Sequence, residues 1–368
     1  MKKIIFTVTN DLSYDQRMIR ICSSLSAAGY PVLLIGVKKS NSLPLQQREY
    51  EQKRLACLFT NGLGFYAEYN TRLFFYLLFK KSGAICAIDI DTILPVWLVT
   101  KLQNKKRVYD AHEYFSQQKE IVTRPGIYKI WHWIERTLIP KFSKGYTVSN
   151  SIAVAFKDKY RVDYEVIRNI PFLKTQQKPL PAKERHILYQ GAVNEARGLE
   201  FLIPAMKMIN TKLLIYGDGN FIGQTKNLIE ANNLQEKVLL KGKVLPEALE
   251  CITSEAYIGI NLVEYIGLNQ YFSLANKFFD YLHHAVPQVT MNFPEYKSIN
   301  DQFEIAVLIN DLQIETITAA INTLLNDEVL YKRLQQNCIK AREELNWQHE
   351  EKKLAAFYNT IFNRSKQE

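Results

Sequence analysis

Buried strands alternate with amphipathic helices in both halves of the chain, and this alternation restricts the fold more than any other feature. Near the N-terminus, apolar runs over 4–9 and 31–37 bracket a helical pattern over 16–28. The same order returns in the second half, where apolar runs over 186–190 and 212–216 flank another helical pattern. Strand, helix and parallel strand in succession form a doubly wound sheet, which binds ligands at the carboxyl ends of its strands. The sequence therefore predicts an α/β protein.

The length of 368 residues exceeds what one typical core accommodates, so we predict two Rossmann-like doubly wound domains that face each other across a cleft. A polar, proline-bearing segment over 172–183 has the composition of a linker. It separates an N-terminal domain (1–172) from a C-terminal domain (173–345). A last helical segment, 346–368, is a candidate to pack back on the N-terminal domain.

Charge and cysteine usage narrow the classes of partner and compartment. The formal net charge of +10 favours phosphate ligands, acidic lipid or nucleic acid. Because the basic residues are scattered and no nucleic-acid-binding module is recognisable, we expect no nucleic-acid partner. Five dispersed cysteines without paired spacing indicate a reduced, cytoplasmic protein. No apolar run has the length of a membrane span, and the first run is too short for a signal peptide.

The longest apolar cluster, residues 73–79, lies between Arg72 and the pair Lys80 and Lys81. Two interpretations stay open for it. The cluster is either an interfacial helix that rests on acidic lipid or a core helix whose lysines reach solvent. The second interpretation is the plainer one.

The stretch from Ser273 to Pro287 predicts a helix with Ser273 as its N-cap, followed by a buried strand. The free N–H groups and positive dipole end at the helix start, with Lys277 in the first turn, form a site for an anion. One turn further along, Asp280 can accept hydrogen bonds from ribose hydroxyls. A diphosphate beside a ribose describes a nucleotide-sugar pocket, and an ordinary capped helix is the plainer alternative.

Loops of the second half supply further candidate positions for the same ligand. Gly191 lets the backbone approach a ligand, and Arg197 offers a fixed positive charge to a phosphate. Gly217 lies in a tight turn after a strand. Val244 follows a strand-end turn within reach of a nucleobase, and Asn269 lies in a loop over the helix that begins near Ser273.

A histidine at the end of a strand is the candidate catalytic position of the first half. His112 and Glu113 come soon after the predicted strand 106–109, where a parallel sheet opens toward its ligand. The imidazole of His112 can donate a hydrogen bond or stabilise charge that develops at a reacting carbon. Asp15 and Arg17 lie at the first loop-to-helix junction, where dipole complementation by the acid and a solvated arginine is the plainer interpretation.

Short motifs follow one another in a fixed order along the chain: Thr9–Arg17, Tyr109–Glu113, Arg168–Pro171, Gly191–Leu199, Gly217–Gly219 and Asn276–Pro287. Each motif is weak alone, but their order and spacing together are specific. Over nearly its whole length the chain resembles the GT-B glycosyltransferases of family 4, in particular bacterial members that build surface polysaccharide.

The resemblance implies a hexosyltransferase that takes a nucleotide diphosphate sugar as donor and transfers the sugar to a glycan or lipid-linked acceptor. It also implies retention of the anomeric configuration, with no cofactor and no bound metal. The expected location is the cytoplasm, with peripheral association at the acidic inner face of the cytoplasmic membrane. The acceptor would be recognised by loops of the first domain around residues 40–70 and 114–130. In the range 40–70 we expect only short strands and loops.

The resemblance also assigns roles by position. His112 approaches the reacting carbon of the donor sugar, and Arg197 binds the diphosphate with help from Lys277. Asp280 binds the ribose hydroxyls. The remaining donor-side positions are Gly191, Gly217, Val244, Asn269, Ser273 and Asn276, and the acceptor-side positions are Asp15, Arg17 and Glu113.

Three departures from the family pattern bear on activity. Phe272 stands where the family's first glutamate would contact sugar hydroxyls, and Asp280 replaces its second, longer acid. Ala192 stands where an arginine commonly follows the glycine of the phosphate loop. The acid pair Asp89 and Asp91 is interpreted as a strand terminus rather than a metal site.

Two alternative functions stay open at this point. A nucleotide-sugar 2-epimerase of the same fold would need acid and base groups on both walls of the cleft, whereas His283 and His284 are predicted to lie in the middle of a helix as packing or surface residues. A non-catalytic nucleotide-sugar-binding protein is the other alternative, because Phe272 removes a sugar contact.

Overall fold

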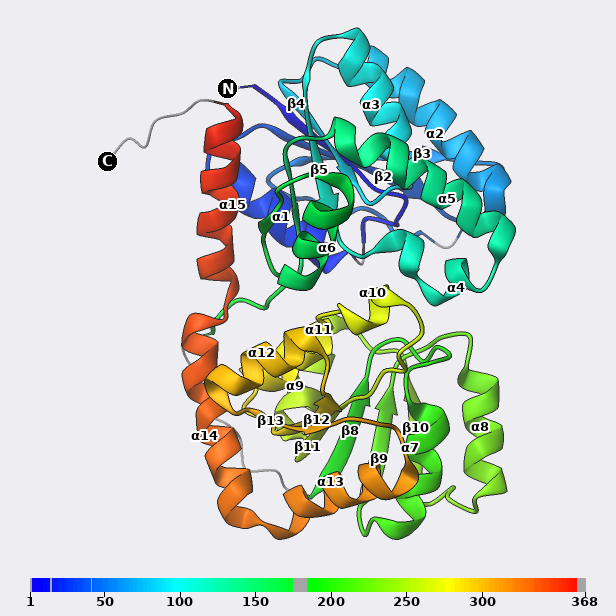
Figure 1. Cartoon of the computed structure of the whole chain (residues 1–368), viewed down its shortest axis with the longest axis vertical. Coiled ribbons are helices and arrows are strands. Elements are labelled where there is room, and N and C mark those ends of the chain that lie inside the picture. The colour runs from blue at the N-terminus through cyan, green and yellow to red at the C-terminus, as the bar shows by residue number, and fades with distance from the viewer. Residues whose placement is uncertain (1, 14, 41, 175–183, 363–368) are drawn as a thin grey trace. The chain divides into compact units, whose positions relative to one another are not determined.

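The computed structural model describes residues 2–13, 15–40, 42–174 and 184–362, which form two compact units (Figure 1). Unit 1 comprises Met1–Asn169 together with Glu350–Glu368, and unit 2 comprises Ile170–His349. Most of the predicted linker, 175–183, lies outside the described residues. Both units are α/β, which confirms the prediction of two Rossmann-like, doubly wound domains.

Unit 1 contains a seven-stranded parallel sheet in the order β3-β2-β1-β4-β5-β6-β7. The chain reverses its winding direction between β1 and β4, so ligands are expected at the carboxyl ends of these strands. The strands are β1 (Ile4–Thr7), β2 (Val32–Lys38), β3 (Glu51–Ala56), β4 (Ala84–Ile88), β5 (Lys106–Ala111), β6 (Gly145–Thr147) and β7 (Glu165–Val166).

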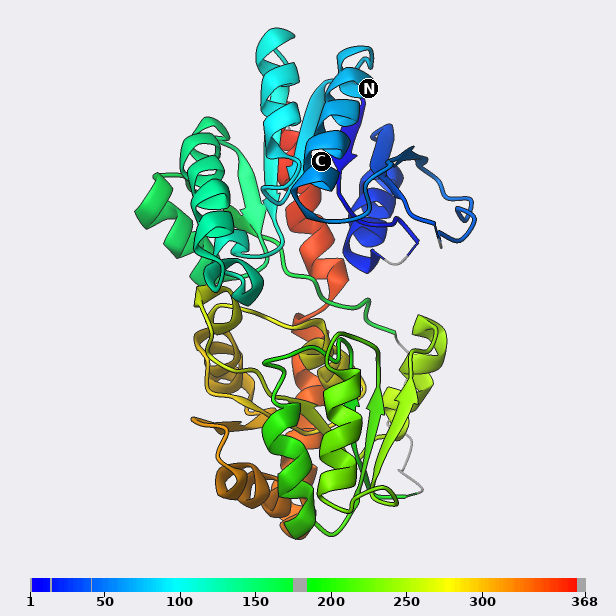
Figure 2. The same cartoon turned by 90° about the vertical axis from the view of Figure 1, so that its right-hand side faces the viewer.

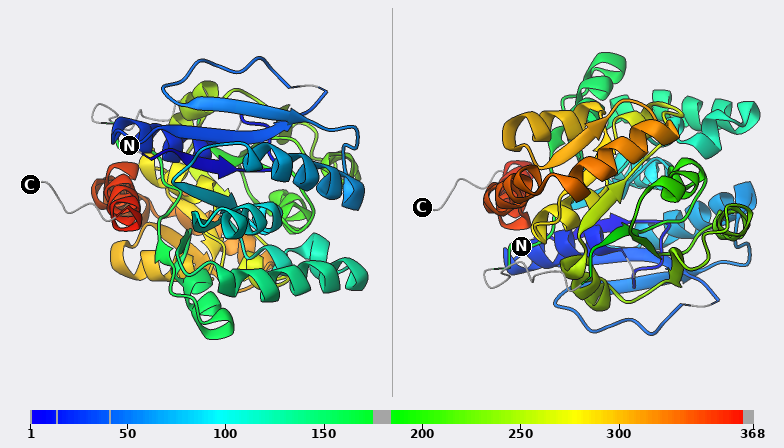
Figure 3. Two further views of the ribbon diagram at one scale, coloured as in Figure 1. Left: turned by 90° about the horizontal axis from the view of Figure 1, so that it is seen from above. Right: turned by 90° about the horizontal axis from the view of Figure 1, so that it is seen from below.

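Helices cover both faces of this sheet (Figures 1 and 3). One face carries α2 (Gly62–Leu78), α3 (Ile93–Leu102), α5 (Pro125–Leu138) and α6 (Asn150–Tyr160), and the other carries α1 (Gln16–Ala27) and the last part of α15 (Trp347–Ile361). The short helix α4 (Lys119–Val122) precedes α5. Since both faces are covered, β1 and β4 consist of buried residues throughout, as is usual for parallel strands.

The C-terminal helix completes the core of unit 1. Tyr358 of α15 is fully buried, and its ring packs against Phe6 of β1 and Tyr146 of β6. Two hydrogen bonds connect α15 to the N-terminal segment: the Ser24 hydroxyl donates to Glu351, and the Tyr30 hydroxyl donates to Asn359. The C-terminal helix therefore packs on a sheet whose strands come from the first half of the chain (Figure 2).

Unit 2 contains a six-stranded parallel sheet in the order β10-β9-β8-β11-β12-β13. Its strands are β8 (His186–Gln190), β9 (Lys212–Tyr216), β10 (Val238–Gly242), β11 (Ile258–Asn261), β12 (Gln288–Met291) and β13 (Ala306–Ile309). Its helices are α7 (Leu199–Ala205), α8 (Ile222–Ala231), α9 (Pro246–Glu255), α10 (Leu268–Tyr271), α11 (Asn276–His283), α12 (Pro294–Phe303), α13 (Ile314–Asn326) and α14 (Glu328–Glu344).

Two local predictions are wrong. Ser273 is not a helix cap, because the chain stays extended through Ala275 and α11 begins at Asn276. The Ser273 hydroxyl instead donates to the carbonyl of Gln270. The stretch 40–70 is not limited to short strands and loops, since α2 begins at Gly62. No helix in the described ranges is long and apolar enough to cross a membrane.

Candidate functional site

At the carboxyl edge of the unit 1 sheet, three charged side chains form a buried network. His112 is the first residue beyond β5, and its Nε2 lies 3.0 Å from Oδ2 of Asp110. The other carboxylate oxygen of Asp110, Oδ1, accepts a hydrogen bond of 2.9 Å from Nη2 of Arg17. Asp110 and His112 are two residues apart along an extended chain, so their side chains leave the same face of the sheet. We call this set the Arg17–Asp110–His112 network.

Arg17 is not a solvated side chain, so that interpretation of the sequence is wrong. Its side chain is only 4% exposed, and Nη1 also donates to the carbonyl of Ile167 at 2.9 Å. A buried guanidinium requires a negative charge and hydrogen-bond acceptors, and here the Asp110 carboxylate supplies the charge while Asp110 and the Ile167 carbonyl each accept one hydrogen bond. No local pattern indicates this pairing, because Arg17 and Asp110 are 93 residues apart.

The network determines the charge of the histidine. Burial alone would raise the pKa of Asp110, but the positive charges of Arg17 and His112 bring it below its usual range. Burial likewise works to lower the pKa of His112, yet the Asp110 carboxylate outweighs burial and raises it above the ordinary 6.5. Asp110 therefore keeps a proton on Nε2 and orients the ring.

Two further acids, interpreted from the sequence as a strand terminus, lie directly after β4 and next to this network. Asp89 Oδ1 accepts a hydrogen bond of 2.9 Å from the backbone N–H of His112, and Asp91 Oδ2 accepts one of 2.5 Å from the Thr9 hydroxyl. Burial raises the pKa of Asp91 to about 6 and that of Asp89 well above its ordinary value. The sequence could have predicted that these acids lie next to His112, because β4 and β5 are neighbours and the carboxyl ends of adjacent parallel strands meet. Within the described ranges, no group of three or more His, Cys, Asp or Glu side chains is placed as a set of metal ligands.

The other acceptor-side candidates have local roles. Asp15 Oδ1 accepts from the backbone N–H of Met18 at 3.0 Å and so caps α1, in agreement with the plainer interpretation. Glu113 is exposed and accepts a hydrogen bond from Gln118. Their contacts to an acceptor stay predictions.

At the carboxyl edge of the unit 2 sheet, glycines allow neighbouring loops to stack. The N–H of Gly191 donates to the carbonyl of Tyr216, and the N–H of Gly217 donates to that of Gly242, each at 2.9 Å. A Cβ atom on Gly217 would lie 1.8 Å from the carbonyl oxygen of Gly191. No side chain fits there, so this edge presents backbone rather than bulk.

The structure brings Gly191, Arg197, Lys277 and Asp280 together beside these loops. Lys277 Nζ lies over the ring of Tyr189, 3.7 Å from its centroid, and Lys277 Cε is 3.6 Å from where a Cβ on Gly191 would be. Asp280 Oδ2 accepts a 3.0 Å hydrogen bond from Gln190 Nε2. The ring of Tyr189, which sequence reasoning missed, belongs to the penultimate residue of β8.

The charge of Lys277 depends on its burial and on its neighbours. Burial, followed by the positive charge of Arg197, lowers the pKa of Lys277 well below the ordinary 10.5, and Asp280 opposes the shift only in part. A second negative group near Lys277 would favour its protonated form, so the site has the electrostatics of an anion site.

The remaining donor-side candidates, Asn276, Val244 and Asn269, lie in or next to three different elements of unit 2. Asn276 is the exposed first residue of α11. Val244 follows the edge strand β10, which is separated from β8 by β9. Asn269 lies in the four-residue helix α10, and Phe272 ends that helix with its ring 5.6 Å from that of Tyr271. Phe272 thus joins an aromatic cluster and offers no polar group in place of the absent acid.

The two histidines weighed for an epimerase lie at the end of α11 rather than in its middle. His283 is buried, with Nε2 2.7 Å from the carbonyl oxygen of Leu345. His284 caps the helix, with Nδ1 2.8 Å from the carbonyl oxygen of Asp280. Both rings are hydrogen-bonded to backbone carbonyls, as expected for packing residues.

The chain matches a known family in sequence and is similar to known proteins in structure. Residues 173–341 match the family model described as glycosyl transferases group 1. A comparison with curated protein sequences found no significant match. Sucrose-phosphate synthase from Thermosynechococcus elongatus has a similar structure, with a TM-score of 0.84 and 17% identity over 99% of this chain and 100% of that one.

Two further solved structures are similar at low identity. Anabaena Alr3699/HepE, solved with UDP-glucose, has a TM-score of 0.79 and 12% identity, over 98% of this chain and 100% of that one. WaaG, a glycosyltransferase involved in lipopolysaccharide biosynthesis, has a TM-score of 0.72 and 13% identity, over 97% and 99%. The chain therefore has the GT-B fold of glycosyltransferases. The matched family segment contains Gly191, Arg197, Lys277 and Asp280.

Proposed function

We propose that the protein is a retaining glycosyltransferase that takes a nucleotide diphosphate sugar as donor. The observation that carries the proposal is the pairing of Arg197 and Lys277 beside Asp280 and the glycine loops of unit 2. This pairing lies inside the segment that matches the group 1 glycosyltransferase model. Two adjacent cations, one of them driven toward its neutral form, fit a ligand with at least two negative charges, and a diphosphate has that chemistry.

In this proposal the transfer breaks the bond between the sugar's anomeric carbon and a phosphate oxygen. The acceptor hydroxyl oxygen bonds to the same carbon, negative charge collects on the departing diphosphate, and the hydroxyl proton passes to the departing phosphate oxygen. Arg197 and a reprotonated Lys277 stabilise that charge. Asp280, whose carboxylate already accepts from Gln190, has a further oxygen lone pair for ribose hydroxyls.

We assign His112 to the reacting carbon of the sugar. Support comes from its position at the carboxyl end of β5 and from the carboxylate of Asp110, which keeps the ring oriented and protonated on Nε2. An oriented imidazole needs no reorganisation when charge develops next to it. The reaction in this proposal requires no bound metal or cofactor.

For the acceptor we propose a glycan or a lipid-linked glycan of bacterial polysaccharide biosynthesis, with transfer of a hexose in the cytoplasm at the inner face of the membrane. The similar structures support this class of reaction: one was solved with UDP-glucose, and another is a glycosyltransferase involved in lipopolysaccharide biosynthesis. We propose that Asp15, Arg17 and Glu113 belong to the acceptor side, in the case of Arg17 through the position that it gives to Asp110 and His112.

The test incubates the protein with UDP-, GDP- and dTDP-sugars and a membrane lipid extract, and follows nucleotide release and labelled product. Transfer of the sugar supports the proposal. Interconversion of donors without acceptor would instead identify an epimerase, and saturable binding without turnover would identify a binding protein. Both outcomes overturn the proposed activity.

Variants then test the assignment of residues. Loss of the imidazole in His112→Ala should lower kcat by roughly 100-fold or more with little change in donor affinity. Loss of a charged phosphate contact in Arg197→Ala should weaken donor binding by about 10- to 100-fold. His349→Ala and Lys226→Ala, at exposed positions, are the matched controls. Wild-type rates in both site variants would remove the assignment.

A further inference from the structure

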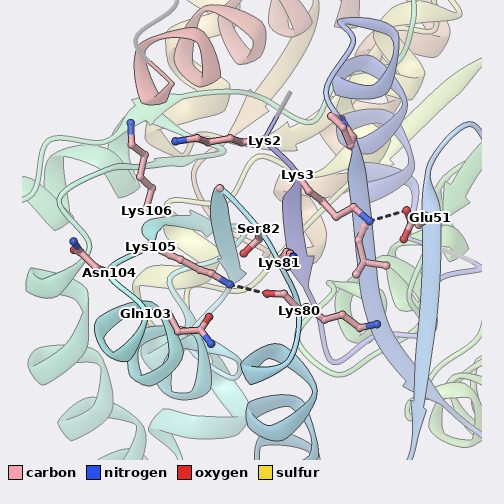
Figure 4. Close-up of a pocket in the computed structure, with 13 residues that line it drawn as sticks. Lys2, Lys3, Glu51, Lys80, Lys81, Ser82, Gln103, Asn104, Lys105 and Lys106 are labelled. Carbon is pink, nitrogen blue, oxygen red and sulfur yellow. Dashed lines mark hydrogen bonds and ion pairs between the residues drawn. The ribbon is translucent and has the colours of Figure 1, made fainter.

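A hollow of about 760 Å³ opens at the amino edge of the unit 1 sheet, the edge opposite to His112 (Figure 4). Six lysines contribute to its lining: Lys2, Lys3, Lys80, Lys81, Lys105 and Lys106. They come from the start of β1 and from the segments that lead into β4 and β5. Among the described residues that line the hollow, Glu51 is the only acid. We call this set the lysine hollow.

Part of this charge has a structural role. Lys3 Nζ pairs with Glu51 Oε1 at 2.7 Å, and Lys105 Nζ donates to the carbonyl of Lys80 at 2.7 Å (Figure 4). The second contact satisfies a backbone acceptor just beyond the end of α2. Lys106 donates to the carbonyl of Ile361. Lys2, Lys80 and Lys81 are exposed, and among the described residues none of these three has an acidic partner within ion-pair distance.

Large apolar side chains are exposed in or next to the chain segments that carry these lysines. Phe79 is 81% exposed, Leu102 at the end of α3 is 67% exposed, and Phe75, one turn before Phe79, is 55% exposed. Phe79 lines a second hollow of about 300 Å³ that shares Lys80, Lys81 and Lys105 with the first. The helix α2 is therefore two-sided: Leu73 and Leu77 are buried in the core of unit 1, while Phe75 and Phe79 are exposed.

We infer that this face of unit 1 docks on an anionic lipid bilayer. The lysines contact lipid phosphates, and Phe79, Phe75 and Leu102 enter the boundary between headgroups and acyl chains. A soluble phosphate would use the charges but would leave the apolar side chains in water, whereas an acidic bilayer accommodates both. The inference names the surface for the membrane association proposed above and does not depend on the sugar chemistry.

The docking surface is separate from the candidate catalytic groups. His112 and Asp110 lie at the carboxyl end of β5 and Arg17 lies in the first turn of α1, whereas the lysine hollow lies at the amino ends of β1, β4 and β5. Substitutions in the hollow therefore leave the proposed chemistry intact. Vesicle binding can be measured without donor or acceptor, so a failure of docking and a failure of the proposed activity are distinguishable.

The test is co-sedimentation of the full chain with vesicles of phosphatidylcholine, alone or with about one quarter phosphatidylglycerol. We expect binding only to the anionic vesicles, weakening as salt rises from about 0.05 M to about 0.5 M. Lys80→Gln/Lys81→Gln should weaken binding roughly 20- to 30-fold, since each lysine near an anionic surface contributes a factor of about five. Phe79→Ser should weaken it roughly 10-fold. Lys207→Gln/Lys226→Gln, at exposed positions of unit 2, is the control with the same charge change and should bind as the wild type does.

Several results would overturn the inference. Equal binding to neutral and anionic vesicles would do so, and so would Lys80/Lys81 variants that bind as well as the control. Binding of pyrophosphate in solution by a protein that does not sediment with vesicles would identify a soluble-anion site instead. Loss of a dimer in Phe79→Ser, seen by sedimentation velocity, together with unchanged vesicle binding would identify a contact between copies of the chain. All substituted side chains are exposed, so the variants are expected to fold, which circular dichroism checks.

Discussion

The carboxyl edges of the two parallel sheets occupy the same topological position, but they are built in opposite ways. In unit 1 the edge contains the Arg17–Asp110–His112 network, in which Asp110 lies between two cations and pairs with both. In unit 2 the edge consists of glycine loops and two cations, and the charge of Arg197 helps to lower the pKa of Lys277. The network contains its own counterion, whereas the unit 2 edge gains stability when an anion binds.

This difference separates two kinds of requirement on a binding site. A group that must act on a reacting atom benefits from fixed orientation before the substrate arrives. A group that must bind and then release a diphosphate benefits when its protonated form is unfavourable in the empty site and is stabilised by the bound anion. The contrast makes three predictions, the largest of which concerns the buried ion pair.

Arg17→Ala should be the most destabilising of the proposed changes. It leaves Asp110 fully buried with only His112 to balance its charge, so we expect a loss of about 3–5 kcal/mol in the free energy of unfolding. Urea denaturation followed by tryptophan fluorescence measures it, because Trp97, Trp131 and Trp133 all belong to unit 1.

The control for this prediction is Arg333→Ala, which removes a pair with Glu304 whose side chains are both about half exposed. An exposed pair contributes less than about 1 kcal/mol. Equal losses in the two variants would mean that the Arg17–Asp110–His112 network is no more than a surface contact.

Gly217→Ala should have the second largest effect, and it tests the backbone character of the other edge. The added Cβ would lie 1.8 Å from the Gly191 carbonyl oxygen, so the two loops must separate, at a cost of roughly 1–3 kcal/mol. Binding of UDP, measured by calorimetry, should weaken with it. Gly223→Ala is the matched control, since no atom lies within 4 Å of its added Cβ and the position is helical.

A Gly217→Ala protein with the melting temperature and UDP affinity of the Gly223→Ala control would contradict the stacked-loop geometry. A protein that loses stability but keeps its affinity would show instead that the loops support the sheet without shaping the binding site. The two readouts therefore separate packing from binding.

Sequence reasoning succeeded where a local pattern determines the structure. The strands β8 and β9 have the predicted boundaries, because each is a short apolar run followed by a glycine turn. The last helical segment, predicted to begin at residue 346, begins at Trp347 as α15. Gly191, Arg197, Lys277 and Asp280 could be grouped because strand ends and helix starts in a doubly wound sheet meet at one edge.

The failures involve contacts that no local pattern reveals. Arg17 resembles a solvated helix residue until its partner, 93 residues away, is known. Ser273 has the composition of a cap, but its hydroxyl bonds to Gln270 and the helix begins only at Asn276. Asp89 lies at the end of a strand as interpreted, but its hydrogen bond to the backbone N–H of His112 was not predicted.

The smallest prediction concerns pH and gives the two edges opposite signs. The pKa of His112 is raised above 6.5, so its stabilising effect is fully present below 6.5 and is lost as pH rises through the raised value. His112→Gln should therefore destabilise the protein more at about pH 6 than at about pH 9, by an amount on the order of 1 kcal/mol. Unfolding in urea at the two pH values measures the difference, with His349→Gln as the control.

For Lys277 the sign reverses, because its pKa is lowered. The cost of its buried charge is full below the lowered pKa and disappears as pH rises toward 10.5, where the unfolded chain also loses its proton. Lys277→Met should therefore stabilise the protein without ligand, more at about pH 6 than at about pH 9, while Lys226→Met changes little at either pH. UDP should then bind Lys277→Met more weakly, since the diphosphate no longer restores a proton to that side chain. Destabilisation by both His112→Gln and Lys277→Met at low pH would mean that the charges of the unit 2 edge, like those of the Arg17–Asp110–His112 network, are paired before any ligand binds.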